Sequence, residues 1–209
     1  MNKKTAKVIV EKLSGIFTDK PALNFSTPYE LLIAVILSAQ CTDERVNKVT
    51  AKLFENYNTP EKMLTLSEEA LAKIILPCGL NNSKAKNILG ASKSIIENFM
   101  GKVPENYDDL LSLPGVGRKT ANVVYSVAFN QPAIAVDTHV FRVSNRIGLA
   151  KSKTPNQTEV QLMKALDKQK WSQMHHYLIY HGRQICLARN PNCAQCVIRD
   201  LCEYKNTTL

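Results

Sequence analysis

Four cysteines lie close together near the C-terminal end of the chain. Six, two and five residues separate consecutive members of this set, which is Cys186, Cys193, Cys196 and Cys202. Thiols clustered in this way in a cytosolic protein indicate a metal site more often than a disulfide framework. Four thiolates suit a structural zinc ion and a [4Fe-4S] cluster equally well, so ligand type alone leaves both open.

A second segment has the residues of a phosphate-binding turn. Residues 113–121, Leu-Pro-Gly-Val-Gly-Arg-Lys-Thr-Ala, join two short helical patterns in a helix-hairpin-helix arrangement. Pro114 restricts one backbone dihedral, and Gly115 and Gly117 carry no side chains that would keep a phosphate from the N–H groups of the second helix. The alternative is a tight turn with no ligand. The residues expected to contact a DNA backbone here are Gly115, Val116, Gly117 and Arg118.

Lys119 and Asp137 are the side chains with the clearest potential for covalent chemistry. Lys119 begins the second helix of the hairpin, where a free amine would suit Schiff-base formation at a sugar carbon. A plain phosphate contact is the simpler interpretation of this lysine. Asp137 lies where an extended connector enters a helix, so local pattern favours an N-cap aspartate. His139 is interpreted as a structural histidine and is given no chemical role.

These residues are positioned by elements that have helical spacing almost throughout, which predicts an all-α fold. Residues 31–37 are apolar on every side and predict a helix buried at the centre of the protein. Amphipathic stripes are expected around it, one of them containing Leu71, Ile74 and Ile75. Cap signals at Thr27 and Thr154 mark helix starts, the first with Glu30 as a capping box. Residues 131–136 form the extended connector, and a last helix is expected from about 171 to 187.

Composition limits the class of protein and its partners. The 27 lysines and arginines exceed the 18 acidic residues, which gives a formal charge of +9 and favours a polyanionic partner such as nucleic acid. A solvated basic surface is the alternative. The sequence shows no signal peptide and no apolar stretch that would span a membrane, so we expect a cytoplasmic protein. Cys41 and Cys78 are expected to be buried free thiols.

The chain resembles the endonuclease III branch of the helix-hairpin-helix DNA glycosylases over essentially its whole length. The resemblance rests on residues 37–43, 113–121 and 136–140 and on the spacing of the cysteine tail, in the order found in that family. It implies a [4Fe-4S] cluster on the four tail cysteines. It also implies that Lys119 is the nucleophile and Asp137 the catalytic carboxylate, and that Gln40 and Leu80 fill the gap left by a flipped nucleotide.

The resemblance further implies a bifunctional N-glycosylase and abasic-site lyase that removes oxidised pyrimidines from duplex DNA and cleaves the strand by β-elimination. We expect a helical barrel domain with the hairpin over residues 22–132, and a cluster domain over residues 1–21 and 133–209. Lys119 and Asp137 are expected to face each other from these two lobes. The expected partner is damaged or abasic double-stranded DNA, bound by a monomer in a bacterial cytoplasm at the nucleoid. Arg189 in the cysteine loop is a possible phosphate contact.

Two other functions compete with this one. The adenine-mismatch branch of the same glycosylases relies on a glutamate in the buried helix, and no carboxylate occurs between Glu30 and Asp43. That branch also lacks a lysine at the position of Lys119. A non-enzymatic DNA-binding module with a zinc site is a different class altogether. It predicts that Lys119→Ala weakens binding without abolishing any reaction.

Overall fold

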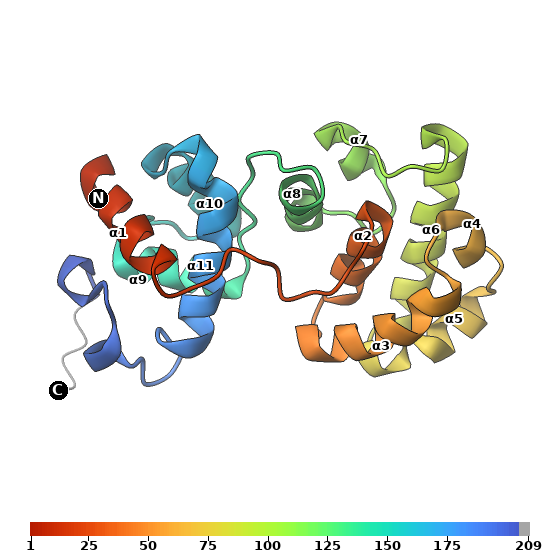
Figure 1. Ribbon diagram of the computed structural model, residues 1–209, viewed down its shortest axis with the longest axis horizontal. Helices are drawn as coiled ribbons and strands as arrows, with labels where there is room; N and C mark the ends of the chain where they lie inside the picture. Colours follow the sequence, from red (N-terminus) through yellow and green to blue (C-terminus); the bar gives the residue numbers. More distant parts are fainter. Residues whose placement is uncertain (205–209) are drawn as a thin grey trace. The chain divides into compact units, whose positions relative to one another are not determined.

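The computed structural model describes residues 1–204, which form helices, turns and loops and contain no strand (Figure 1). The all-α prediction is confirmed. The α-helices are α1 (Lys3–Ser14), α2 (Pro28–Leu37), α3 (Asp43–Asn56), α4 (Pro60–Met63), α5 (Glu68–Ile74), α6 (Asn81–Phe99), α7 (Tyr107–Ser112), α8 (Arg118–Val127), α9 (Thr138–Ile147), α10 (Pro155–Ala165) and α11 (Trp171–Gln184). Short 3-10 turns are η1 (Leu76–Cys78), η2 (Lys168–Lys170), η3 (Cys193–Gln195) and η4 (Arg199–Leu201).

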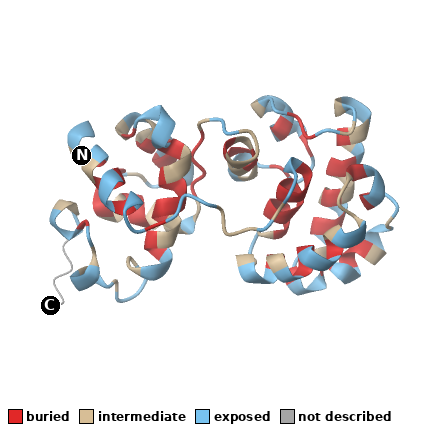
Figure 2. Ribbon diagram, viewed as in Figure 1, coloured by how far each residue is buried: buried red, intermediate tan, exposed pale blue. Residues whose placement is uncertain are grey.

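The chain forms two compact units, and one of them is assembled from both ends of the sequence. Unit 1 contains Met1–Lys20 and the chain from Gln131 onward, whereas unit 2 is the continuous segment Pro21–Asn130. Each unit has its own set of buried apolar side chains, and Figure 2 shows that most helices bury one face and expose the other. Burial of such faces is the main source of stability in domains of this size.

Unit 2 is built around α2, whose residues from Tyr29 to Leu37 are all buried. Thr27 caps the helix by accepting from the backbone N–H of Glu30 at 3.1 Å. The expected capping box differs in detail, because Glu30 Oε2 accepts from Ser26 N at 2.6 Å, one residue before the cap. This bond gives the buried carboxylate a partner and fixes the entry of the chain into α2.

Unit 1 packs α1, α9, α10 and α11 around a separate core. Helices α9 and α11 approach closely at Gly182, where an added Cβ would lie 3.0 Å from Val143 Cγ2 and 3.1 Å from His139 Cβ. A side chain at this position would push the two helices apart. The indole N–H of Trp171 donates to the backbone oxygen of Leu166 at 3.2 Å, which satisfies the polar atom of a buried ring.

Three expectations for local structure were wrong. Ile74 is 37% exposed because the helical face of α5 that packs inward carries Leu71 and Ala72. Helix α11 ends at Gln184, three residues before the expected Leu187, since the chain turns there into the cysteine loop. Cys41 is partly exposed, although Cys78 is buried as expected. No described helix is both long and apolar enough to cross a membrane.

Candidate functional site

The hairpin between α7 and α8 needs glycine at position 115 for two reasons. Gly115 has a φ of +76°, a left-handed conformation that side chains disfavour, and an added Cβ would lie 2.6 Å from Asn87 Cβ on α6. Leu113 and Val116 are buried on either side of the turn, and Val116 N donates to Leu113 O at 3.0 Å. The hairpin is therefore a rigid part of unit 2.

Gly117 is different, because nothing surrounds the space where its side chain would be. It is the N-cap of α8 with an extended φ of −90°, and no atom lies within 4 Å of an added Cβ. In the described structure, no side chain caps this helix. The first turn of α8 thus offers its N–H groups to an anion in open space. The sequence analysis gave Gly115 and Gly117 the same role. In the structure, Gly115 is required by the backbone of the turn, whereas Gly117 leaves open space at the start of α8.

Lys119 lies in this first turn of α8 and its side chain is exposed, as is that of Arg118. The opposite face of α8 carries Ala121 and Val124, both fully buried against the core of unit 2. The helix is consequently held firmly while its two cationic side chains face solvent. A lysine in this place is accessible to a substrate that binds at the hairpin.

Asp137, in unit 1, is half-buried and caps α9. Its Oδ1 accepts from Val140 N at 2.7 Å, and its backbone oxygen accepts from Phe141 N at 2.8 Å. The N-cap interpretation from the sequence is confirmed. Capping occupies one carboxylate oxygen and fixes the side chain in one orientation. The cap is therefore compatible with a second role for this carboxylate.

The connector that leads to Asp137 is held by two residues of α11 that the sequence did not single out. His175 Nδ1 is 2.8 Å from Ala135 O, and Ser172 Oγ donates to Ala133 O at 3.4 Å. Residues 133–136 are buried. The separation of 40 residues between His175 and Ala135 leaves no local pattern by which to detect this bond.

His139 behaves as the structural histidine that was expected. Its Nδ1 lies 3.3 Å from Arg142 Nη2, and the same guanidinium donates to Gly182 O at 2.8 Å and to Cys186 O at 3.0 Å. Burial lowers the pKa of His139, which keeps the ring neutral beside the arginine. Arg142 thereby connects α9, α11 and the start of the cysteine tail.

Gln40 and Leu80 are both exposed residues with left-handed backbone conformations in unit 2. Gln40 has a φ of 55° in the turn after α2, and Leu80 has a φ of 49° immediately before α6. Leu80 is 54% exposed, although sequence pattern alone would make it an ordinary core residue. The side chain of Leu80 is therefore accessible to a partner that approaches this turn.

All four tail cysteines line one cavity of unit 1, together with residues of α9 and α11. Arg146 Nη1 donates to Cys186 Sγ at 3.6 Å and to Leu187 O at 2.6 Å. His181 Nε2 lies 3.7 Å from Cys196 Sγ. The sequence-predicted ligands are thus brought together, while Arg189 in the intervening loop is exposed.

The donor set of this cavity fits a bound iron-sulfur cluster. Burial raises the pKa of the Cys196 and Cys202 thiols, so their thiolate forms need a bound cationic partner to offset the loss of water. Within residues 1–204, no group of three or more His, Cys, Asp or Glu side chains lies close enough to hold a single metal ion. All four tail cysteines line one cavity, and four thiolates are the usual ligands of an iron-sulfur cluster.

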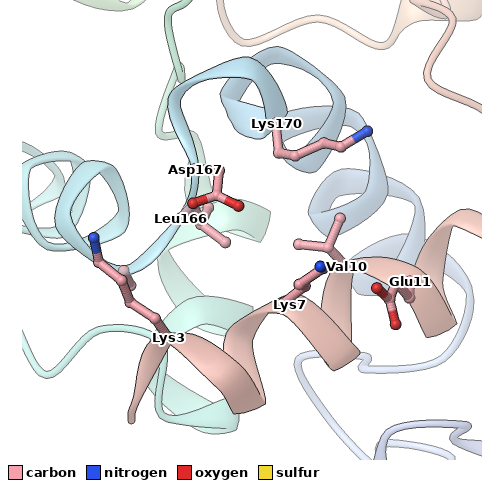
Figure 3. A pocket seen from close by; sticks show the side chains of 8 residues that line it. Lys3, Lys7, Val10, Glu11, Leu166, Asp167 and Lys170 are labelled. Carbon is pink, nitrogen blue, oxygen red and sulfur yellow. The ribbon is translucent and has the colours of Figure 1, made fainter.

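Another cavity of unit 1 has no part in this chemistry. It lies between α1 and the segment joining α10 to α11 (Figure 3). Its lining mixes opposite charges, with Lys3 and Lys7 on one wall and Asp167 on the other. None of the predicted site residues contributes to it.

Comparisons with known proteins identify the family of this chain. Residues 33–168 match the HhH-GPD superfamily of base excision DNA repair proteins. Residues 186–202, which begin and end at cysteines of the tail, match the iron-sulfur binding domain of endonuclease III. Fold and cysteine centre therefore define a base excision repair protein that carries an iron-sulfur cluster.

Individual relatives specify the family. The chain is 51% identical over 201 residues to endonuclease III of Rickettsia conorii, covering 94% of this chain and 96% of the relative. It is 54% identical over 183 residues to endonuclease III of Escherichia coli K12, covering 88% and 87%. A solved covalent endonuclease III–DNA intermediate superposes with a TM-score of 0.92 at 45% identity, covering 97% of this chain and 96% of that one. The chain belongs to the endonuclease III family, whose members are DNA glycosylases with abasic-site lyase activity.

Proposed function

We propose that Lys119 is the nucleophile and Asp137 the catalytic carboxylate of a glycosylase and lyase that removes oxidised pyrimidines from duplex DNA. The observation that carries this proposal is the exposed amine of Lys119 in the first turn of α8, directly after the open N-cap at Gly117. A phosphate bound at that N-terminus would hold the sugar-phosphate chain beside the amine. We further propose that the enzyme acts in the cytoplasm, on the nucleoid.

The reaction begins when the damaged nucleotide leaves the base stack, because its C1′ carbon is out of reach inside a duplex. Lys119 Nζ forms a bond to C1′ as the bond from C1′ to the base breaks and the base departs with its electron pair. Asp137 stabilises the positive charge that develops on the sugar and accepts a proton from the attacking amine. Ring opening then gives a covalent imine.

The imine makes the strand cleavable. It acidifies the C2′ hydrogen, so loss of that proton expels the 3′ phosphate by β-elimination. The proposed cluster ligands Cys186, Cys193, Cys196 and Cys202 have a separate task. When bound, the cluster supplies metal–thiolate bonds that hold residues 186–202 in place.

Borohydride trapping tests the nucleophile directly. The cluster-loaded protein is mixed with a duplex that contains one thymine glycol, borohydride is added, and the covalent adduct is measured for wild type, Lys119→Ala and Lys164→Ala. Lys164 is an exposed lysine on α10 and serves as the matched control. We expect an adduct with wild type and Lys164→Ala and none with Lys119→Ala. An adduct of normal yield with Lys119→Ala would overturn the proposal.

A duplex with a mispaired adenine, treated with alkali after incubation to reveal base loss, separates the competing glycosylase function. The only carboxylate in α2 is Glu30, which is buried and bonded to Ser26 N, so we expect no adenine excision. Tight duplex binding by a folded wild type that forms no adduct on thymine glycol or abasic DNA would instead favour the non-enzymatic module.

A further inference from the structure

Lys84 is a buried cation that contacts two separate turns of unit 2. It lies in the first turn of α6 and is only 3% exposed. Its Nζ donates to Leu37 O at 2.8 Å and to Cys78 O at 2.9 Å, and its backbone N–H donates to Leu80 O at 2.9 Å. Lys84 is therefore bonded to the last residue of α2, to Cys78 at the end of η1 and to Leu80 immediately before α6.

These two turns carry Gln40 and Leu80. Leu37 precedes Gln40 by three residues, and Cys78 precedes Leu80 by two. Left-handed conformations such as those of Gln40 and Leu80 are unfavourable for residues with side chains, and they persist only where neighbouring contacts hold them. The bonds from Lys84 are contacts of this kind, because they fix the backbone just before each left-handed residue.

Electrostatics make the burial of Lys84 costly, which argues for a specific role. Leu37 is the last residue of α2, so its carbonyl lies at the negative end of the helix dipole and lacks a partner within the helix. The neighbouring thiols of Cys41 and Cys78 are hydrogen bonded to each other, and burial raises the pKa of Cys78 to about 11. Lys84 thus has carbonyl oxygens and neutral thiols around it, a weaker compensation for a buried ammonium than an ion pair would supply.

We infer that Lys84 is a positioning residue for lesion recognition, since it fixes Gln40 and Leu80 relative to each other so that both enter the DNA stack as one preformed unit. The inference rests on the proposed function, in which these two side chains fill the gap left by the flipped nucleotide. Rigid placement matters because a flipped base returns to the stack unless the gap is filled at once.

The test follows unstacking by the fluorescence of a 2-aminopurine placed beside a thymine glycol in a duplex. Lys84→Met keeps the apolar stem and removes the three N–H donors of the ammonium, and Lys93→Met on the exposed face of α6 is the control. We expect Lys84→Met to lose the fluorescence rise and to lower the excision rate at saturating duplex by about 10- to 100-fold. Adduct formation with an abasic site in single-stranded DNA should stay within about twofold of wild type, because no stack has to be filled there.

Two outcomes would overturn the inference. One is a normal fluorescence rise and excision rate with Lys84→Met, and the other is an equal loss of reaction on duplex and single strand, which would indicate general damage to the fold. If Lys84→Met does not fold by circular dichroism, Lys84→Leu, which also removes the N–H donors but has a shorter apolar side chain, is measured against the same outcomes.

Leu80→Ala and Gln40→Ala separate this inference from the proposed function. If either variant abolishes the fluorescence rise while Lys84→Met leaves it intact, the inference fails and the proposed roles of Gln40 and Leu80 stand. If neither variant changes the signal, those proposed roles fail, and the inference that depends on them fails with them. A double variant tests whether Lys84 acts through Leu80. If it does, the fold-reduction in excision rate for the variant with both Lys84→Met and Leu80→Ala should be smaller than the product of the fold-reductions of the two single variants.

Discussion

Arg146 Nη1 donates to the backbone oxygen of Leu187 at 2.6 Å, which bonds α9 directly to the loop between Cys186 and Cys193. Its Nη2 also donates to Ala188 O at 2.9 Å, and the guanidinium lies over the ring of Tyr204 at 4.8 Å. One side chain thereby contacts both the loop between Cys186 and Cys193 and the ring of Tyr204, which follows the last cysteine. A backbone bond from Asn192 N to Ile185 O at 2.9 Å also closes this loop.

We expect Arg146→Met to weaken cluster retention. The variant loses charge-assisted hydrogen bonds worth about 2 kcal/mol, so its cluster should be lost at lower urea concentrations than that of the wild type. Visible absorption of the cluster during a urea titration measures this directly. Arg45→Met, at an exposed position of α3 in unit 2, is the control. Equal cluster loss in wild type and Arg146→Met would contradict the expectation.

Asp137→Asn separates the two proposed steps of the reaction. The amide oxygen of asparagine can still accept from Val140 N, so the cap of α9 and the fold should persist. Loss of the charge should slow thymine glycol excision by at least about 100-fold. Borohydride trapping on a preformed abasic site, where no base has to leave, should be much less affected. Normal excision by a folded Asp137→Asn would remove the aspartate from the mechanism.

Gly115→Ala and Gly117→Ala should differ sharply, although the two glycines are separated by one residue. The φ of +76° and the close approach of Asn87 predict that Gly115→Ala destabilises unit 2 by about 2 kcal/mol. Gly117→Ala should change stability by less than about 0.5 kcal/mol and weaken binding to undamaged duplex, since a methyl group would crowd an approaching phosphate. Urea unfolding and fluorescence anisotropy measure the two effects. Equal destabilisation by both variants would refute the distinction.

The free energy of unfolding should decrease as the pH falls below the ordinary pKa of histidine, and His176 is one of the buried histidines that contribute, with His181. Burial, reinforced by the neighbouring His175 and partly opposed by Asp19, lowers the pKa of His176 from 6.5 to about 3. Between pH 6.5 and about pH 3, His176 is therefore protonated in the unfolded chain and neutral in the folded protein. The free energy of unfolding consequently decreases as the pH is lowered through this range. From pH 7.5 to pH 5 the contribution is about 2 kcal/mol.

The His176→Gln variant tests this assignment. Its free energy of unfolding should decrease less between pH 7.5 and pH 5 than that of the wild type, whatever its stability at pH 7.5. Urea titrations at both pH values, with visible absorption used to confirm an intact cluster, give the comparison. Identical pH dependence in the two proteins would show that another group is responsible.

Sequence patterns predicted the features that depend on neighbouring residues. The caps at Thr27 and Thr154 and the hairpin turn each follow from a few adjacent side chains, and the structure has them where they were expected. The burial of α2 follows in the same way from seven consecutive apolar residues at positions 31–37. Local propensity and local apolar spacing suffice for such features.

Features that depend on distant residues were not predictable. Lys84 and Leu37 are 47 positions apart, and Arg146 and Leu187 are 41 apart, so no short motif signals either contact. Leu80 is exposed in a turn whose backbone is bonded to Lys84, and the local sequence does not reveal this contact. An isolated apolar residue in a sequence looks like core unless its backbone partners are known.

The division of unit 1 between the two ends of the chain affects how the protein is made on the ribosome. Helix α1 is synthesised before unit 2, with Ile9 and Leu13 on an apolar face that α11 covers only after about 160 more residues have been added. Unit 2 is complete long before that and can fold while synthesis continues. During this interval the apolar side chains of α1 lack their partners in α11, so unit 1 completes its core only after unit 2 has been synthesised.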